Sequence, residues 1–185
     1  MPTLETAGDL GHLGHLQQFV NTWSIPNDTR VVTDVLPGLL GDSAAWNALF
    51  PFALGAQDSH AAMLRLRDDL RATIADPSCL QGTLNAWLQK AALGMAVKVQ
   101  DGLPVLHTTN PRHSAQGAIL VIAMEAIGRG DWVRLKCCAD CQWCFFDSSK
   151  NRSKRWCGMS KGGPEGRACG TIAKVRSFRE RQKGA

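Results

Sequence analysis

The last quarter of the chain gathers the residues whose types and spacing could bind a metal ion. Residues 136–185 hold six of the seven cysteines. Cys138 and Cys141 are separated by two residues, which is the spacing of a knuckle that supplies two thiolates to one ion. Cys157 and Cys169 follow and could complete a set of four. Because four thiolates in a tetrahedron suit a structural Zn²⁺, the spacing predicts one structural zinc ion.

Two further cysteines compete for this site. Cys137 directly precedes the knuckle and would lengthen its first spacing, whereas Cys144 stands in the aromatic run QWCFF, which is typical of a strand that packs inward. A set that uses Cys137 stays an alternative. The ligands we favour are Cys138, Cys141, Cys157 and Cys169.

Positive charge is concentrated in the same segment. The chain has a net charge of +5, with 12 Lys and Arg against 4 Asp and Glu in residues 136–185 and 9 against 12 in residues 1–135. A basic tail on a mildly acidic body is typical of a nucleic-acid-binding module. A solvated basic terminus would have the same composition.

Seven of these cations are candidate nucleic-acid contacts, and they fall into two groups around the last two cysteines. Three of them precede Cys157, and the others lie on residues 172–183, where the pattern predicts a helix with Ile172, Val175 and Phe178 turned inward. A thiolate at Cys169 would then lie near the positive end of this helix. The candidate phosphate or base contacts are Arg152, Lys154, Arg155, Lys174, Arg176, Arg179 and Arg181.

The elements that must position this segment lie upstream, in residues 1–134. Residues 59–75 predict an amphipathic helix whose apolar residues recur every four positions, and its Asp and Arg residues predict a solvated face. Residues 114–129 predict a buried central helix that leads into the cysteine segment. Residues 10–23 and 80–93 predict two more helices. Ser43 is the predicted N-cap of a shorter one, and Cys79 is predicted to be buried.

After residue 93 the spacing of apolar residues changes from helical to alternating, which indicates one hairpin. Residues 95–99 and 103–107 alternate around the turn dipeptide Asp101-Gly102, and Pro104 favours an edge strand. The fold class predicted is mainly α with a small β-hairpin (α+β), plus a C-terminal treble-clef or ribbon-like zinc finger. The predicted domains are residues 1–134 and residues 135–185.

Several function classes find no support in the sequence. It contains no nucleophile elbow, phosphate-binding Gly-rich loop or His-Glu-x-x-His pattern, so we expect no enzyme activity. It also contains no signal peptide and no apolar run long enough to span a membrane, so we expect no membrane partner. An odd number of clustered cysteines without a secretory leader favours reduced thiols or metal ligation, and therefore the cytoplasm.

The run FFDSSKNRSKRWCGM resembles the CGNR zinc-finger family, whose members carry an Asp-x-Ser-x-Asn-x-Ser-Arg-Arg-Trp-Cys-x-Met block. The family signature Cys-Gly-Asn-Arg reads Cys169-Gly170-Thr171-Ile172 here, so the Asn and Arg are replaced. The matching block residues are Asp147, Ser149, Asn151, Ser153, Lys154, Arg155, Trp156, Cys157 and Met159.

The resemblance also implies an architecture and a function. In that family the finger follows a helical domain called ABATE, and residues 19–22 (Phe-Val-Asn-Thr) resemble its early motif. It implies a bacterial, stress-induced transcription regulator that binds DNA. The body would then sense a small-molecule effector or form a homodimer.

Two alternatives stay open. In the first, the protein binds a ligand or another protein, and its finger is purely structural. In the second, Cys138 and Cys141 perform thiol redox chemistry, which normally requires a thioredoxin-like strand–helix unit.

Overall fold

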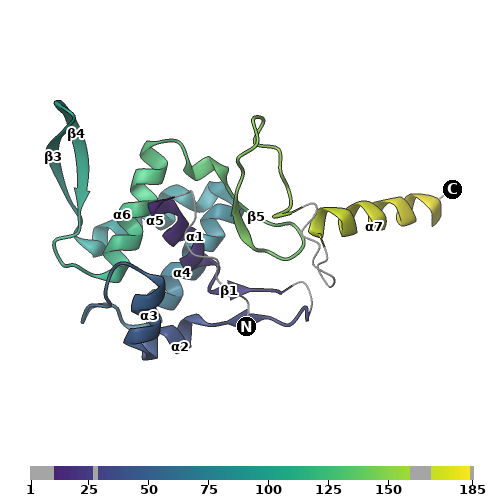
Figure 1. The fold of residues 1–185 in the computed structure, drawn as a ribbon, viewed down its shortest axis with the longest axis horizontal. Helices are drawn as coiled ribbons and strands as arrows, with labels where there is room; N and C mark the ends of the chain where they lie inside the picture. The colour runs from purple at the N-terminus through teal and green to yellow at the C-terminus, as the bar shows by residue number, and fades with distance from the viewer. Residues whose placement is uncertain (1–10, 27–28, 159–167, 184–185) are drawn as a thin grey trace.

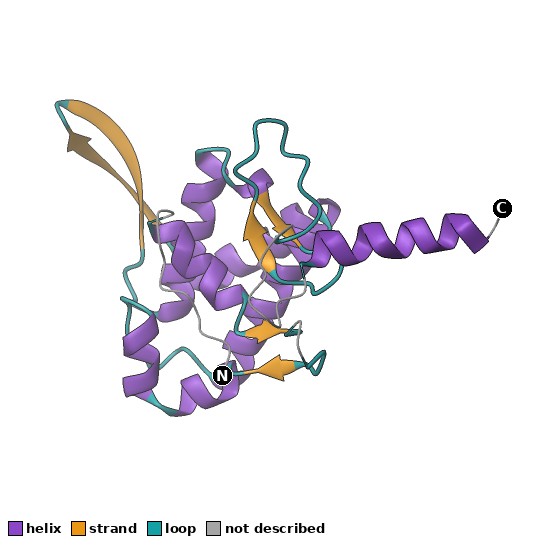
Figure 2. Ribbon diagram, turned by 45° about the vertical axis from the view of Figure 1, so that its right-hand side comes forward, coloured by secondary structure: helices purple, strands orange, loops and turns teal. Residues whose placement is uncertain are grey.

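A helical body with two projections makes up the fold. The computed structural model describes residues 11–26, 29–158 and 168–183. Figure 1 shows the body between the β3–β4 hairpin, which projects on one side, and helix α7, which projects on the other. The sheets of the described residues are three antiparallel pairs, β1–β2, β3–β4 and β5–β6 (Figure 2). The predicted α+β class is therefore confirmed.

Two long helices form the centre of the body. Helix α4 (His60–Ala75) begins after Ser59, whose hydroxyl accepts a hydrogen bond from the N–H of Ala62. Helix α6 (Ala115–Gly128) begins after Ser114 in the same way and buries half of its residues. Both match the predicted helices. The other helices of the body are α1 (His12–Val20), α2 (Leu36–Gly41), α3 (Ser43–Leu49) and α5 (Leu80–Ala91).

Three local predictions need correction. Asp42, not Ser43, caps helix α3, because its carboxylate accepts hydrogen bonds from the backbone of Ala44 and Ala45. Helix α1 ends at Val20, and the chain turns into strand β1 (Trp23–Ser24), which pairs with β2 (Thr33–Asp34). Cys79 is half-buried in a 3₁₀ turn (Pro77–Cys79) rather than buried.

The predicted hairpin is present as strands β3 (Gly94–Gln100) and β4 (Leu103–Thr109), paired along their full length. Asp101 and Gly102 both have positive φ, as a two-residue type I′ turn requires. Because each strand has one neighbour in the described part of the chain, both are edge strands. The face that carries Met95, Val97 and Leu106 is about 70% exposed.

The third strand pair joins the cysteine segment to the body. A 3₁₀ turn (Trp132–Arg134) leads from α6 into β5 (Leu135–Cys137), which pairs with β6 (Cys144–Phe146). Leu135 and Cys144 belong to the same buried core as the helices of the body. The apolar core is thus continuous across residue 134, and the division into domains at that point stays a prediction.

Helix α7 (Cys169–Lys183) begins at the last cysteine and leads away from the body (Figure 1). The predicted inward orientation is wrong for two of its three apolar residues, because Val175 is 44% exposed and Phe178 is 55% exposed, whereas Ile172 is half-buried. A helix that projects from the body has no large surface to cover. In the described ranges, no helix has the length and apolar character needed to cross a membrane.

Candidate metal centre

The four cysteines favoured from the sequence meet at one point. The Sγ atoms of Cys138, Cys141, Cys157 and Cys169 all lie within 4.8 Å of one another. Three of these residues are buried and Cys157 is partly exposed. They come from three separate parts of the chain, namely the turn between β5 and β6, the segment before residue 158, and the start of α7.

The spacing of the sulfur atoms fits a tetrahedral zinc ion. The Sγ atoms of Cys141 and Cys157 are 3.6 Å apart, and those of Cys157 and Cys169 are 3.9 Å apart. A tetrahedron with Zn–S bonds of about 2.3 Å has edges of about 3.8 Å. The described part of the chain therefore forms a site that fits one structural Zn²⁺, which would link the knuckle to the first turn of α7.

The pKa shifts of the clustered thiols also favour a cation at the centre. Hydrogen bonds from the thiols of Cys141 and Cys157 lower the pKa of Cys138 well below its ordinary value. Hydrogen bonds to Cys138 and Cys141, together with burial, raise the pKa of Cys157. The cluster on its own stabilises one thiolate at the expense of its neighbours, and a metal ion would allow all four to ionise.

Backbone N–H groups support the knuckle. Those of Asp140 and Cys141 donate to the sulfur of Cys138, and that of Trp143 donates to the sulfur of Cys141. Gln142 has a φ of 57°, which turns the chain back into β6. These donors would partly offset the net negative charge of a zinc ion bound to four thiolates.

The segment after β6 is organised by one buried carboxylate. Asp147 accepts hydrogen bonds from the ammonium of Lys136 (2.9 Å), from the backbone and hydroxyl of Ser149, and from the backbone of Lys154 (2.9 Å). Burial by itself would raise the pKa of Asp147, but Lys136 and these hydrogen bonds hold the pKa below its ordinary value. Asp147 and Ser149 of the family block thus fix the loop that carries Arg152 and Lys154.

Sequence reasoning missed the residues that join this segment to the body. The Asn21 side chain, 3% exposed, donates to the carbonyl of Cys144 and accepts from its N–H, both at 2.8 Å. Arg71 of α4 donates to the carbonyls of Val20 (2.7 Å) and Gln142 (2.9 Å) and lies over the ring of Trp23. Asn21 was named only as part of a motif, and local sequence gives no signal for its partner 123 positions away.

The predicted solvated face of α4 is therefore wrong for two of its arginines. Arg67 is 3% exposed and pairs with Asp34 (2.5 Å) and Asp68 (2.9 Å), while Arg71 holds the turn of the knuckle. The sequence did contain a signal for the burial of Arg67, since Arg67 lies four positions after Met63 and so falls within the apolar stripe of the helix.

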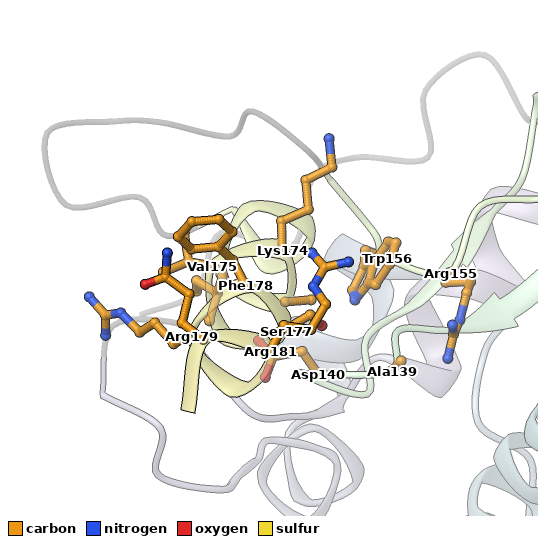
Figure 3. Close-up of a pocket in the computed structure, with 13 residues that line it drawn as sticks. Ala139, Asp140, Arg155, Trp156, Lys174, Val175, Ser177, Phe178, Arg179 and Arg181 are labelled. Carbon is orange, nitrogen blue, oxygen red and sulfur yellow. The ribbon is translucent and has the colours of Figure 1, made fainter. Parts of the chain in front are cut away.

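The candidate nucleic-acid contacts lie at the surface around the metal site. The side chains of Arg155, Lys174, Arg179 and Arg181 line one groove of about 900 Å³, together with Trp156 and Phe178 (Figure 3). Arg152 and Lys154 are exposed on the neighbouring loop. The side chain of Arg176 lies outside the described residues, as does Met159.

The competing cysteines form a pair of their own. Cys137 and Cys144 lie opposite each other in β5 and β6, with their Sγ atoms 3.1 Å apart. As the aromatic run predicted, Cys144 is fully buried and packs against the body. Neither residue belongs to the four-cysteine cluster.

Fold and site together define a zinc-finger protein, in which a helical body carries a four-cysteine metal site at its C-terminal end. Residues 134–182 match the family model of the CGNR zinc finger, so the chain carries a finger of that family. The matched segment contains all four clustered cysteines. A search of curated proteins finds no match to the chain. The resemblance of residues 19–22 to the ABATE motif stays a prediction.

Proposed function

We propose that this protein is a DNA-binding transcription regulator without enzyme activity, whose zinc finger and helix α7 contact DNA. The observation that carries the proposal is the groove between the knuckle and α7. Arg155 and Trp156 contribute to one side of it, and Lys174, Arg179 and Arg181 contribute from α7 (Figure 3). Cations on two elements that face a common groove are suited to phosphate contacts, which fix a protein on its duplex.

A salt titration tests this proposal. The affinity for a random-sequence duplex should fall linearly with salt on logarithmic axes, with a slope of about −0.9 for each phosphate contact. The double variant Arg179→Ala/Arg181→Ala should therefore make that slope less steep by about 2. The matched double variant Arg112→Ala/Arg129→Ala removes two exposed cations from the body and should leave the slope unchanged. Absence of duplex binding at low salt, or equal effects of both pairs, would contradict the proposal.

A second candidate function is the binding of a protein or ligand, with the finger as a purely structural element. The exposed apolar side chains of Val175 and Phe178 favour it, since a solvated helix has no need of them. In this case Val175→Ser/Phe178→Ser would abolish the protein's function in cells, whereas Arg179→Ala/Arg181→Ala would leave that function intact. DNA binding predicts the opposite order of effects.

We infer that the body associates as a homodimer through the β3–β4 hairpin. Among the described residues no strand pairs with the outer edge of either strand, and the apolar face with Val97 and Leu106 is exposed, which is unusual for a monomer. Light scattering should give the mass of two chains, and Val97→Lys/Leu106→Lys should reduce it to that of one. A monomeric native chain would contradict this inference.

An effector of the body would need a pocket. One of about 450 Å³ lies between α4 and α5 and offers Arg65, Asp69, Trp87 and Lys90 to a small polar molecule. We assign the proposed effector to this pocket. The pocket lies on α4, and Arg71 of the same helix donates to the carbonyl of Gln142 in the finger. Effector binding in this pocket would therefore be coupled to the finger through α4.

A further inference from the structure

Two cysteines of the finger have no role in the zinc site. Cys137 and Cys144 are directly opposite each other in the antiparallel β5–β6 pair. Their sulfur atoms are 3.1 Å apart, and a disulfide bond of about 2.05 Å would require them to approach by about 1 Å. Rotation of the two side chains can supply a movement of this size.

The backbone at this position suits a cross-strand disulfide. The N–H and the carbonyl of Cys144 bond to the side chain of Asn21 rather than to β5, whereas the next pair is joined by the N–H of Cys138 and the carbonyl of Trp143 (2.9 Å). Cys137 and Cys144 therefore form a non-hydrogen-bonded pair. In such pairs the Cα atoms are about 4.5 Å apart, which lies within the range that disulfides bridge.

Strand geometry separates this pair from the zinc ligands. Neighbouring residues of a strand point to opposite faces, so the side chain of Cys137 packs towards α4 and that of Cys138 points into the four-cysteine cluster. Arg71 of α4 lies beside the pair, with its carbonyl 3.9 Å from the sulfur of Cys137 and its guanidinium 3.7 Å from that of Cys144. A bond between Cys137 and Cys144 uses none of the four cysteines of the metal site.

We propose that Cys137 and Cys144 are a disulfide-forming modification site that reacts with hydroperoxides. The sulfur of Cys137, the more exposed of the two, attacks a peroxide oxygen and gives up its proton. An S–O bond forms, the O–O bond breaks, and hydroxide leaves and is protonated to water. The Cys144 sulfur then attacks the sulfenic sulfur of Cys137, the S–S bond forms, the S–O bond breaks, and the released hydroxide takes the Cys144 proton and leaves as a second water. The two thiols lose two hydrogens in total, and hydrogen peroxide is reduced to two waters.

This modification would reinforce the junction between the body and the finger. The disulfide closes a ring over residues 137–144, which contains the knuckle cysteines Cys138 and Cys141. It ties β5 to β6 at the point where both strands contact the body through Asn21 and Arg71. The oxidised chain therefore keeps its zinc ion and its fold.

Peptide mapping of the zinc-loaded full chain tests the proposal. The chain is treated with one equivalent of hydrogen peroxide, denatured, alkylated and cut by a protease that cleaves before aspartate. Cleavage before Asp131, Asp140 and Asp147 separates residues 131–139 from residues 140–146. The expected product is these two peptides joined by one disulfide, with Cys138 and Cys141 alkylated. A chromogenic chelator added before denaturation should detect no released zinc.

Variants make the assignment specific. Cys144→Ala should abolish the linked peptide and leave a sulfenic acid at Cys137 that a 1,3-diketone probe traps. Cys79→Ala removes a half-buried cysteine outside the pair and should leave the yield of linked peptide unchanged. If Cys144→Ala fails to bind zinc, Cys137→Ala, at the less buried position, serves the same comparison. Alkylation of both Cys137 and Cys144 in the oxidised native chain would overturn the proposal. So would a linkage through Cys138 or Cys141 with release of zinc.

Discussion

The body and the finger are held together by different forces. The body buries large apolar side chains, among them Phe19, Trp46 and Phe50, in one continuous core. The second core, in the finger, consists of Cys138, Cys141, Cys169 and one buried aromatic residue, Phe145. Trp143, Trp156 and Cys157 only partly cover it. Apolar burial accounts for the stability of the body, whereas the finger depends on its sulfur ligands.

Polar interactions also have different roles in the two regions: they supplement the apolar core of the body, and they are the main support of the finger loop. In the body the best-buried ion pair, between Arg67 and Asp34, joins α4 to the end of β2 and supplements an apolar core. In the finger, the loop of residues 148–154 has no buried apolar side chain, and hydrogen bonds of Asp147, Arg134 and Lys136 hold it in place. Loss of one polar group should therefore affect the finger more than the body.

Removal of zinc should have the largest effect and should separate the two regions. A structural zinc ion contributes about 10 kcal/mol to a small domain of this kind. With a chelator, hydrogen exchange should become fast in α7 and in the knuckle while α4 and α6 stay protected. Added zinc should restore the original pattern. Loss of protection in α4 and α6 would show that the body also depends on the metal.

Asp147→Asn should be the most damaging single substitution in the finger outside the four cysteines. It leaves Lys136 beside an uncharged amide and turns amide hydrogens towards N–H donors, at a cost of about 3–5 kcal/mol. Because the folded finger binds zinc, zinc affinity should fall by about 100-fold or more in a competition titration with a chelator. Asp131→Asn, a more exposed aspartate outside the cluster, is the control and should change little.

The pH dependence of this effect follows from the lowered pKa of Asp147. A carboxylate whose pKa is lower in the folded state contributes fully above its unfolded pKa, about 4, and loses that contribution as pH falls towards the folded pKa. The difference in zinc-binding free energy between the native chain and Asp147→Asn should be constant from pH 5 to 7 and should shrink below about pH 4. Protonation of the zinc ligands occurs in both proteins and cancels in the difference. A gap that widens on acidification would contradict this explanation.

The corresponding substitution in the body is Leu66→Ala. Leu66 is fully buried in α4, and its truncation should lower the free energy of unfolding of the body by about 3 kcal/mol. Calorimetry should show a lower melting temperature, and metal analysis should still find one zinc ion per chain. Val133→Ala removes methyl groups from a 55% exposed side chain and is the control. Loss of zinc in Leu66→Ala would mean that the two regions unfold as one unit.

The sequence predicted the elements whose pattern is local. Two-residue spacing placed Cys138 and Cys141 in a knuckle, and apolar periodicity placed helices α4 and α6. Cys157 and Cys169 could be added because four thiolates are the usual complement of a structural zinc ion. The choice against Cys137 agrees with the structure, since strand alternation directs it away from Cys138.

What the sequence could not predict depends on contacts between distant residues. Nothing near Arg71 shows that its guanidinium reaches the carbonyl of Gln142, and nothing near Val175 and Phe178 shows that α7 leaves the body. An amphipathic pattern identifies an apolar face, but only the tertiary fold determines whether another element covers it. The uncovered face of α7 is therefore the main difference between the predicted and the observed finger.

The smallest expected effect concerns the contact between the two regions. Asn21→Ala leaves the N–H and the carbonyl of Cys144 without their partner in a buried position, which should cost about 2 kcal/mol. Because Asn21 belongs to the body and Cys144 to the finger strand, this substitution should speed hydrogen exchange in β6 while leaving α4 and the zinc content unchanged. Asn151→Ala, at an exposed asparagine of the finger, is the control and should have an effect below about 0.5 kcal/mol. If Asn21→Ala instead lowered the stability of α4 and β6 equally, the body and the finger strand would form one cooperative unit, and only the metal cluster with α7 would be separable from it.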